Sequence, residues 1–305
     1  MPNALEQLQH SIMPPQLQVL ASPLLESKQL RLSVLRLDTM HREIQGNKWF
    51  KLRLNLARAV DGGAHKIVSF GGAYSNHLYA LAAAGSALGV ETVGFVRGEI
   101  VEPFNPVIRF LKAHNMALIP LSRSDYRRKA DPNFLEALLA KHGPAYLIPE
   151  GGSNELGVKG CEDIAKLVAL AIPVNNQSIV ALACGTGATM AGVVNGFASL
   201  GTANSVLGVS VLKAPGYMGN AVAEKLPLAS SAAIAWSVSD DYHWGGYGKS
   251  NPQLEKFMAG FAQQHDVPLE HVYTGKLFFA LDSMIRQDVF PAGSHICALH
   301  TGGIV

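Results

Sequence analysis

Short apolar segments rich in β-branched residues alternate with helical patterns along almost the whole chain, and this alternation limits the possible folds. Strands separated by helices of about 10–15 residues are typical of parallel sheets that are covered on both faces. The pattern predicts strands over Leu30–Leu37, Lys66–Phe70, Thr92–Val96, Ala117–Pro120, Tyr146–Pro149, Ser178–Ala183, Val206–Val211, Ala233–Val238 and His295–His300. It predicts helices over Asn47–Val60, Ser75–Leu88, Pro106–His114, Pro132–His142, Gly157–Leu170, Gly187–Leu200, Asn251–His265 and Gly275–Gln287. The sequence therefore predicts an α/β fold with parallel-type sheets flanked by helices.

The length of 305 residues favours two domains or one large α/β unit. The chain could cross between domains near Lys51, in the first long helix, and again at the glycine-rich turn 151–154. We expect a larger domain built from residues 1–51 and 154–305, and a smaller inserted βαβ domain over residues 52–153.

Composition excludes several classes of protein. The 25 basic and 23 acidic side chains give a net charge of +2. This excess of positive charge is too small for a protein that binds nucleic acid or an anionic membrane surface. The longest weakly polar stretch, Leu78–Val90, is shorter than the roughly 20 residues that a bilayer-spanning helix needs. Cys161, Cys184 and Cys297 are odd in number and widely spaced, which predicts free thiols, no metal site and a cytoplasmic location.

Three glycine-containing turns carry the candidate chemistry, and the first is Gln45-Gly46-Asn47-Lys48. Lys48, Lys51 and Asn55 are spaced three and four apart and share one helix face. One interpretation is an ordinary amphipathic helix with two solvated lysines. The other is that Lys48 points into a pocket, where the helix N-terminus and Lys51 lower its pKa and prepare it as a Schiff-base lysine.

The second turn is Ser69-Phe70-Gly71-Gly72-Ala73-Tyr74-Ser75-Asn76-His77. A strand ends here, two glycines permit a tight turn, and a helix begins near Ser75. Helix N-termini present free N–H groups that bind carboxylates, and Ser and Asn are good N-caps. A capped helix without a ligand is the alternative interpretation, and His77 by itself is more often structural than catalytic.

The third turn, Gly185-Thr186-Gly187-Ala188-Thr189, follows the strand Ser178–Ala183 and precedes a helix. Glycine and hydroxyl residues in this position form a cup of backbone N–H groups that suits a phosphate. The spacing of the glycines does not match the G-x-G-x-x-G fingerprint of dinucleotide-binding proteins. Cys184 is predicted to face the core, because no base is placed to activate it.

A lysine at a helix start, an Asn-bearing turn and a separate phosphate cup fit pyridoxal 5′-phosphate (PLP) better than NAD or ATP. The chain resembles the family of 1-aminocyclopropane-1-carboxylate (ACC) deaminases and D-cysteine desulfhydrases, which share the tryptophan-synthase β-subunit fold (PLP fold type II). The resemblance runs through Leu37-Asp38, Gly46-Asn47-Lys48, Gly72–His77, Pro149–Ser153, Gly185–Thr189, Asp240-Asp241-Tyr242, Val272–Lys276 and His300-Thr301-Gly302-Gly303.

The resemblance implies a cofactor role for several residues. Lys48 would hold PLP covalently, and Lys51 would contribute to cofactor binding. Asn76 would bond the 3′-oxygen of the pyridine ring, and Thr274 would meet the ring nitrogen. The phosphate would be bound by Gly185, Thr186, Gly187, Ala188 and Thr189.

On the substrate side, the N-terminus of the helix at Ser75 would receive the substrate carboxylate. The residues that the resemblance implies for substrate binding are Ser75, Asn76, His77, Tyr247 and Thr301. Tyr247 and Tyr273 join Lys48 as candidate catalytic residues.

Two threonines bear on the choice of substrate. Family members that open the cyclopropane resemble one another in having Glu after Val-Tyr and Leu after the final His, where this chain has Thr274 and Thr301. A carboxylate keeps the ring nitrogen protonated and makes the ring a deep electron sink, whereas a hydroxyl makes a shallower one. Expulsion of a thiolate can proceed with the shallower sink.

We therefore hypothesise a cytoplasmic, homodimeric PLP-dependent lyase that acts on a small amino acid and releases pyruvate, ammonia and sulfide from D-cysteine. Deamination of ACC, or β-elimination from another amino acid, is an alternative with the same cofactor. A non-catalytic amino-acid- or PLP-binding relative is an alternative of a different class. An NAD-dependent dehydrogenase is disfavoured because the nucleotide fingerprint is missing.

Overall fold

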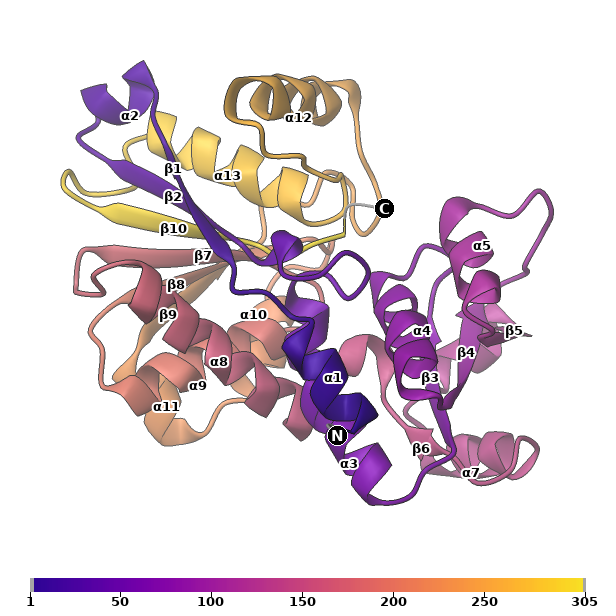
Figure 1. The fold of residues 1–305 in the computed structure, drawn as a ribbon. Helices are drawn as coiled ribbons and strands as arrows, with labels where there is room; N and C mark the ends of the chain where they lie inside the picture. The colour runs from indigo at the N-terminus through magenta and orange to yellow at the C-terminus, as the bar shows by residue number, and fades with distance from the viewer. Residues whose placement is uncertain (1–2, 304–305) are drawn as a thin grey trace.

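The computed structural model describes residues 3–303, which form two lobes, each built around one sheet (Figure 1). The larger sheet has the strand order β1-β2-β10-β7-β8-β9. Its strands are β1 (Gln16–Leu20), β2 (Arg31–Arg36), β7 (Ser178–Cys184), β8 (Ser205–Ser210), β9 (Ala235–Ser239) and β10 (His295–His300). All neighbouring strands of this sheet pair in parallel except β1, which runs antiparallel to β2.

The smaller sheet has the order β5-β4-β3-β6 and is parallel throughout. Its strands are β3 (Lys66–Gly71), β4 (Glu91–Arg97), β5 (Ala117–Leu121) and β6 (Tyr146–Leu147). Every strand of this sheet lies between residues 66 and 147, whereas those of the larger sheet lie before residue 37 or after residue 177. The proposed domain boundaries near residues 51 and 153 remain a prediction.

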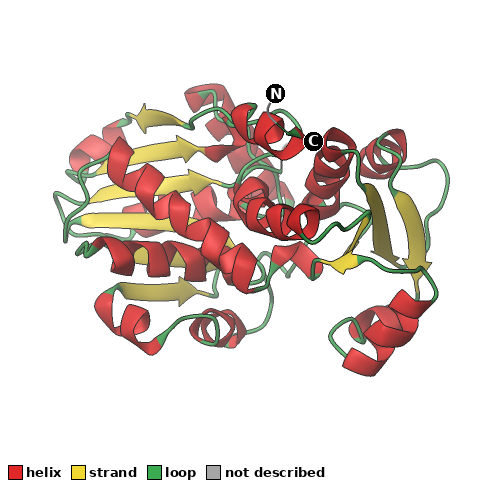
Figure 2. Ribbon diagram, turned by 60° about the horizontal axis from the view of Figure 1, so that its bottom comes forward, coloured by secondary structure: helices red, strands yellow, loops and turns green. Residues whose placement is uncertain are grey.

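Helices cover the sheets on both faces (Figure 2). The longer ones are α3 (Asn47–Asp61), α4 (Asn76–Leu88), α5 (Pro106–Ala113), α7 (Pro132–Ala140), α8 (Glu155–Ala171), α9 (Ala188–Leu200), α12 (Pro252–His265) and α13 (Thr274–Arg286). The shorter ones are α1 (Ala4–His10), α2 (Pro23–Ser27), α6 (Arg123–Arg127), α10 (Tyr217–Ala223) and α11 (Leu228–Ala233), with 3₁₀ turns η1 (Leu37–Thr39) and η2 (Glu150–Gly152). The predicted α/β class with helix-flanked, parallel-type sheets is confirmed.

Each predicted strand and helix has an observed counterpart, with ends that differ by a few residues. One edge strand, β1, was not predicted, and it pairs antiparallel with β2. The segment Gln16–Leu20 alternates glutamine with apolar residues and packs only part of one face, so it lacks the continuous apolar run of the buried strands. The short helix α1 was also missed; it is held by a capping box in which Asn3 and Glu6 bond each other's backbone N–H.

The two lobes share one apolar core. A single cluster of buried side chains includes Leu52 and Leu56 of α3, Leu78 and Leu81 of α4, and Phe197 of α9. The helix α3 connects the lobes and packs against α8. Because these side chains exclude water jointly, the shared core holds the two lobes together.

A polar network joins the two predicted domain crossings. The buried side chain of Asn55 in α3 donates from Nδ2 to Asn154 Oδ1 at 3.1 Å and accepts from Asn154 Nδ2 at 2.7 Å. Asn154 also caps α8 by accepting the N–H of Gly157. The start of α8 is thereby tied to the middle of α3, one turn beyond Lys51.

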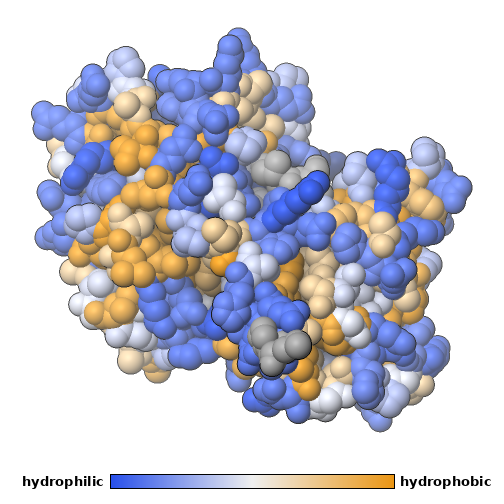
Figure 3. Space-filling model, in the orientation of Figure 1, coloured by the Kyte–Doolittle hydropathy of each residue, from blue (hydrophilic) through white to orange (hydrophobic). Residues whose placement is uncertain are grey.

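The surface is mixed in character. In the space-filling view, apolar residues gather on the larger lobe, and an indentation along the upper edge separates the two lobes (Figure 3). Among residues 3–303, no helix is long and apolar enough to cross a membrane.

Candidate active site

Lys48 is positioned by the Gly46-Asn47 turn, which contacts the chain at the end of β10. Gly46 precedes it with φ +60° and ψ −139°, a conformation that is open essentially to glycine alone. A Cβ atom at Gly46 would lie 1.9 Å from the carbonyl oxygen of Thr301, and the N–H of Asn47 donates to that same oxygen at 3.3 Å. The glycine therefore permits close contact between the start of α3 and the chain that leaves β10.

The amine of Lys48 lies in a half-buried position beside uncharged groups. Its Nζ donates to Asn47 Oδ1 at 2.8 Å and lies 5.9 Å from the centroid of the Tyr273 ring. Burial, followed by the charge of Lys51, lowers the pKa of Lys48 to about 7. The expected lowering is present, with desolvation as its main cause, and the free amine that results is a competent nucleophile or base.

Lys51 links the Lys48 helix to the predicted phosphate cup. Its side chain is buried, and its Nζ donates to Thr186 Oγ1 at 3.2 Å. Burial lowers the pKa of Lys51, and no carboxylate pairs with it within residues 3–303. A buried ammonium without an anion is costly, so this position suits an incoming anionic group.

The predicted phosphate cup lies between β7 and α9. Gly187, at the N-cap of α9, has φ +76°. Thr189 Oγ1 accepts from Asn47 Nδ2 at 2.9 Å, so the cup is bonded directly to the turn that carries Lys48. The start of α9 directly follows Thr186, whose hydroxyl accepts from Lys51, so an amine, a hydroxyl and a helix N-terminus lie close together. This combination suits an anion, and phosphate binding here remains a prediction.

The N-terminus of α4 is organised as expected for the second turn. Ser75 is the N-cap, and its Oγ accepts the N–H of Leu78 at 3.2 Å. His77 is only 3% exposed, and its Nε2 lies 2.9 Å from Ser69 Oγ. Burial, with the charges of the two nearby lysines, holds the pKa of His77 well below 6.5. His77 is therefore a neutral ring tied to β3, and its substrate-binding role remains a prediction.

Glu270 is a site residue that the sequence reasoning missed. Its carboxylate accepts the N–H groups of Val272 at 2.6 Å, Tyr273 at 2.8 Å and Thr274 at 2.7 Å. The positive end of α13 is thus already occupied by a protein carboxylate. The available sequence signal was an acidic side chain just before a helix start.

Glycine at position 303 brings Glu270 close to Asn76. A Cβ atom there would lie 2.7 Å from Asn76 Nδ2 and 3.3 Å from Glu270 Cγ. The end of the described chain therefore passes between the N-terminus of α4 and the loop before α13. Asn76, as predicted, lies in the same neighbourhood as the other site residues.

The two candidate threonines have different surroundings. Thr274 is fully buried, and its Oγ1 lies 3.2 Å from a carboxylate oxygen of Glu270 and accepts the N–H of Glu270 at 3.0 Å. Thr301 is 7% exposed, and its carbonyl contacts the Gly46 turn. The hydroxyl of Thr274 is thus already bonded within the protein, and its contact with a ring nitrogen remains a prediction.

Tyr247 and Tyr273 form a pair beside Lys48. Their hydroxyl groups are 3.4 Å apart, and their rings meet edge to face with centroids 5.9 Å apart. Burial raises the pKa of both phenols, that of Tyr273 well above 10, so both are protonated at neutral pH. Lys276 holds the Tyr247 loop by donating from Nζ to the carbonyl of Gly246 at 2.8 Å.

Cys184 faces the core, as predicted. Its side chain is buried, and burial raises the pKa of its thiol to about 12. A protonated, enclosed thiol is not a nucleophile at neutral pH. Cys161 and Cys297 are also buried and unpaired.

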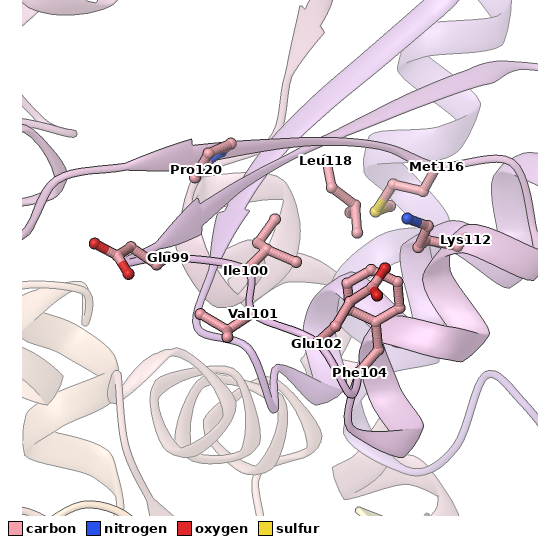
Figure 4. A pocket seen from close by; sticks show the side chains of 9 residues that line it. All are labelled: Glu99, Ile100, Val101, Glu102, Phe104, Lys112, Met116, Leu118 and Pro120. Atoms are coloured by element: carbon pink, nitrogen blue, oxygen red, sulfur yellow. The ribbon is translucent and has the colours of Figure 1, made fainter.

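A separate cavity of about 720 Å³ lies in the smaller lobe (Figure 4). It is lined by Glu99, Ile100, Val101, Glu102, Phe104, Lys112, Met116, Leu118 and Pro120. The ammonium of Lys112 lies 4.2 Å from the centroid of the Phe104 ring. Because this cavity includes no predicted site residue, we assign it no part in the chemistry.

A comparison with known families matches residues 16–302 to the model for pyridoxal-phosphate dependent enzymes. The chain belongs to this family. The match agrees with the choice of PLP over a nicotinamide dinucleotide.

Relatives of this PLP enzyme are known by sequence and by structure. It is 28% identical over 269 residues to the "Putative 1-aminocyclopropane-1-carboxylate deaminase" of Pyrococcus horikoshii, covering 86% of this chain and 81% of the relative. The protein of the same name from Pyrococcus abyssi is also 28% identical, over 271 residues, with the same coverage. Over most of its length the chain is thus similar to proteins named as putative ACC deaminases.

Solved structures show the same fold. An ACC deaminase homologue superposes with a TM-score of 0.80 at 24% identity, covering 100% of this chain and 95% of the other. A threonine deaminase from Solanum lycopersicum gives a TM-score of 0.70 at 13% identity, with coverage of 99% and 83%. A hydrogen sulfide-producing enzyme from Fusobacterium nucleatum gives 0.68 at 14% identity, with complete coverage of both chains. The predicted fold type II architecture is confirmed.

The residues present fit PLP. The uncompensated ammonium of Lys51 and the cup at Gly187 suit a phosphate dianion, and the Lys48 amine, with its lowered pKa, suits a carbonyl carbon. When bound, PLP supplies an electron sink for the carbanion that forms at the α-carbon of an amino acid.

Gly187→Asp is expected to weaken PLP binding at least tenfold. A carboxylate would repel the phosphate, the φ of +76° disfavours a side chain, and a Cβ would lie 3.1–3.2 Å from Val222 and Ala221. Thr186→Ala should weaken binding only several-fold, because it removes one hydrogen bond worth about 1 kcal/mol. Spectral titration of cofactor-free protein measures both.

Gly201→Asp is the matched control, since Gly201 ends the same helix with φ +65° and nothing within 4 Å of a Cβ. It should carry a similar backbone cost without touching the cup. Equal PLP affinity in Gly187→Asp and Gly201→Asp would show that the Gly185–Thr189 turn does not bind the phosphate.

Proposed function

We propose that this PLP enzyme catalyses β-elimination from D-cysteine, producing pyruvate, ammonia and sulfide. The observation that carries the proposal is the Lys48 amine, whose pKa is about 7. Lys48 follows Asn47, which bonds Thr189 of the proposed phosphate cup, and its charge acts on His77 in the first turn of α4. The two threonines, Thr274 and Thr301, support the choice of a thiol-bearing substrate.

The residues act in a defined order. The N–H groups at the start of α4, with Ser75 and Asn76, hold the substrate carboxylate. The Lys48 amine takes the α-proton, which its near-neutral pKa allows at physiological pH. The carbon–sulfur bond then breaks and sulfide leaves. Water hydrolyses the released enamine to pyruvate and ammonia, so one cysteine and one water are consumed.

The tyrosine pair supports the leaving group. Both phenols are protonated. Tyr273, beside Lys48, donates to Tyr247, so the Tyr247 hydroxyl is the one free to donate a hydrogen bond to departing sulfur. Tyr247 is 46% exposed at the outer side of the pair, where product can leave to solvent. A cytoplasmic location and a homodimer are further parts of this proposal; sedimentation of the purified chain tests the latter.

Deamination of ACC is the second candidate, favoured by the names of the Pyrococcus relatives. Opening an unactivated ring asks more of the electron sink than expelling a thiolate does. In this chain, Thr274 provides a hydroxyl at the position where the ring-opening members of the family have a carboxylate. We therefore propose D-cysteine as the better substrate.

The wild-type enzyme is expected to have a kcat/KM for D-cysteine at least tenfold above that for ACC. The double change Thr274→Glu with Thr301→Leu should move this ratio toward ACC, because ring electronics and pocket shape act on the same transition state. Parallel assays of pyruvate and sulfide, with cofactor content measured for each protein, give the ratio.

A wild-type preference for ACC would contradict the assignment of D-cysteine and leave the PLP lyase in place. Firmly bound PLP with no turnover of either compound, or of a panel of D- and L-amino acids, would favour the non-catalytic binding protein instead.

A further inference from the structure

His300, the last residue of β10, contacts two other loops of the site. Its ring is fully buried. Its Nε2 lies 2.7 Å from the carbonyl oxygen of Pro268, and its Nδ1 lies 3.0 Å from Asp38 Oδ1. None of the roles assigned above uses His300 or Asp38, although both belong to segments that the sequence singled out.

Each contact leads to a part of the site. Asp38 lies in η1, and the carbonyl of Leu37 beside it accepts the N–H of Gly46 at 3.0 Å. Pro268 lies two residues before Glu270, which caps α13. The residue after His300 is Thr301, whose carbonyl meets the Gly46–Asn47 turn. His300 therefore joins the three chain segments that surround Lys48.

The partners of the ring identify its charge state. A carbonyl and a carboxylate are acceptors only, so a ring that donates to both carries a proton on each nitrogen. The N–H of Gly302 is a competing partner for Nδ1 at 3.4 Å, which would suit a neutral ring. The carboxylate is closer, and an unprotonated Nδ1 would turn its lone pair toward a buried negative charge.

Arg36 completes the cluster. Its guanidinium bonds both oxygens of Asp38, with Nε at 2.9 Å from Oδ1 and Nη2 at 2.7 Å from Oδ2. Asp38 is thus flanked by a guanidinium and an imidazole ring that come from different strands. No other charged side chain forms an ion pair with His300 or Asp38 within residues 3–303.

We propose that His300, held as an imidazolium between Asp38 and Pro268, is the positioning residue that seats the Lys48 turn on the end of β10. The contact between this turn and β10 is close, since the Thr301 carbonyl lies too near Gly46 for any side chain at that position. A shift of this carbonyl would loosen the start of α3 and admit water to the Lys48 amine. Burial is the main cause of the low pKa of Lys48, so hydration would raise that pKa.

A purely structural role for His300 would lower stability and leave Lys48 unchanged. The two roles are separated by measuring the pKa of Lys48 in the full chain freed of cofactor, through competitive acetylation with acetic anhydride across a pH range. This readout does not require the proposed function, because it involves neither PLP nor turnover. Failure of PLP to bind would contradict the proposed function alone.

His300→Gln should raise the pKa of Lys48 by about one unit or more. At pH 7 the free-amine fraction would then fall from about one half to about one tenth. His295→Gln is the matched control: His295 begins the same strand, is half-buried and bonds Ser33 Oγ at 2.9 Å. Its replacement should leave Lys48 unchanged. An unchanged pKa of Lys48 in folded His300→Gln would overturn the proposal.

Nitrogen NMR of histidine-labelled wild-type protein tests the charge state without any substitution. Protons on both ring nitrogens of His300 at pH 7 are expected, and an unprotonated Nδ1 would overturn the proposal. If His300→Gln does not fold, Asp38→Asn replaces it, since it keeps the ring and removes the charged acceptor. A pKa of Lys48 equal to that of the wild type in Asp38→Asn would likewise overturn it.

Discussion

Lys48→Ala should abolish covalent attachment of PLP and reduce activity by at least about 100-fold, because one amine serves as both the attachment point and the base. Borohydride reduction of the wild type, followed by peptide mapping, should place the adduct on Lys48. Lys51→Ala should keep the attachment and weaken affinity, since Lys51 faces the phosphate cup through Thr186.

Lys276 is the internal control for this result. It is also a buried lysine, and burial lowers its pKa to about 8. Its Nζ is turned toward the Gly246 carbonyl, away from the anion site. A low pKa alone thus does not separate Lys48 from Lys276, whereas position does. A reduced adduct on Lys276 or Lys51 would contradict the assignment of Lys48.

Asp38→Asn should lower the free energy of unfolding by about 3–5 kcal/mol at pH 7. The side chain of Asp38 is 7% exposed. Replacing its carboxylate by an amide leaves Arg36 and His300 without their shared anionic partner. Asp282→Asn is the control, because its pair with Arg286 is largely exposed and should contribute at most about 1 kcal/mol. Urea unfolding of the wild type, Asp38→Asn and Asp282→Asn measures the three free energies of unfolding.

The effect of pH on this pair has a defined sign. Burial raises the pKa of Asp38, but bonds from His300 and Arg36 outweigh it and bring the pKa to about 2. A carboxyl whose pKa is lower in the folded state stabilises the fold above its unfolded pKa of 3.8. That contribution, about 2 kcal/mol, is lost as the pH falls toward 2. The stability gap between wild type and Asp38→Asn should therefore narrow below pH 4, and a constant gap would contradict the assignment.

The elements of the fold were readable because their signals are local. Continuous apolar runs mark β3 and β7 as strands buried on both faces, and capping residues such as Ser75 mark helix starts. The strand β1 was missed because two of its five residues are polar and its pairing depends on β2. Pairing direction depends on the path of the whole chain.

The candidate site divides in the same way. The Gly46-Asn47-Lys48 turn and the Gly185–Thr189 cup were found from the sequence, since glycine and hydroxyl residues carry their meaning within a few positions. Glu270 was not found, because its three N–H partners are brought together around the carboxylate only where the chain turns into α13 at Thr274.

By itself, the sequence determined the alternation of strands and helices and the cofactor class, whereas Lys48 as the reactive lysine remains a prediction. The tertiary structure alone decided the charge environment. His77 is neutral because burial and two lysines act on it together, and Asp38 and His300, 262 positions apart, meet only where β2 and β10 lie side by side. Desolvation and Coulombic interactions depend on distance in space and on the exclusion of water, and neither is encoded in the spacing of residues along the chain.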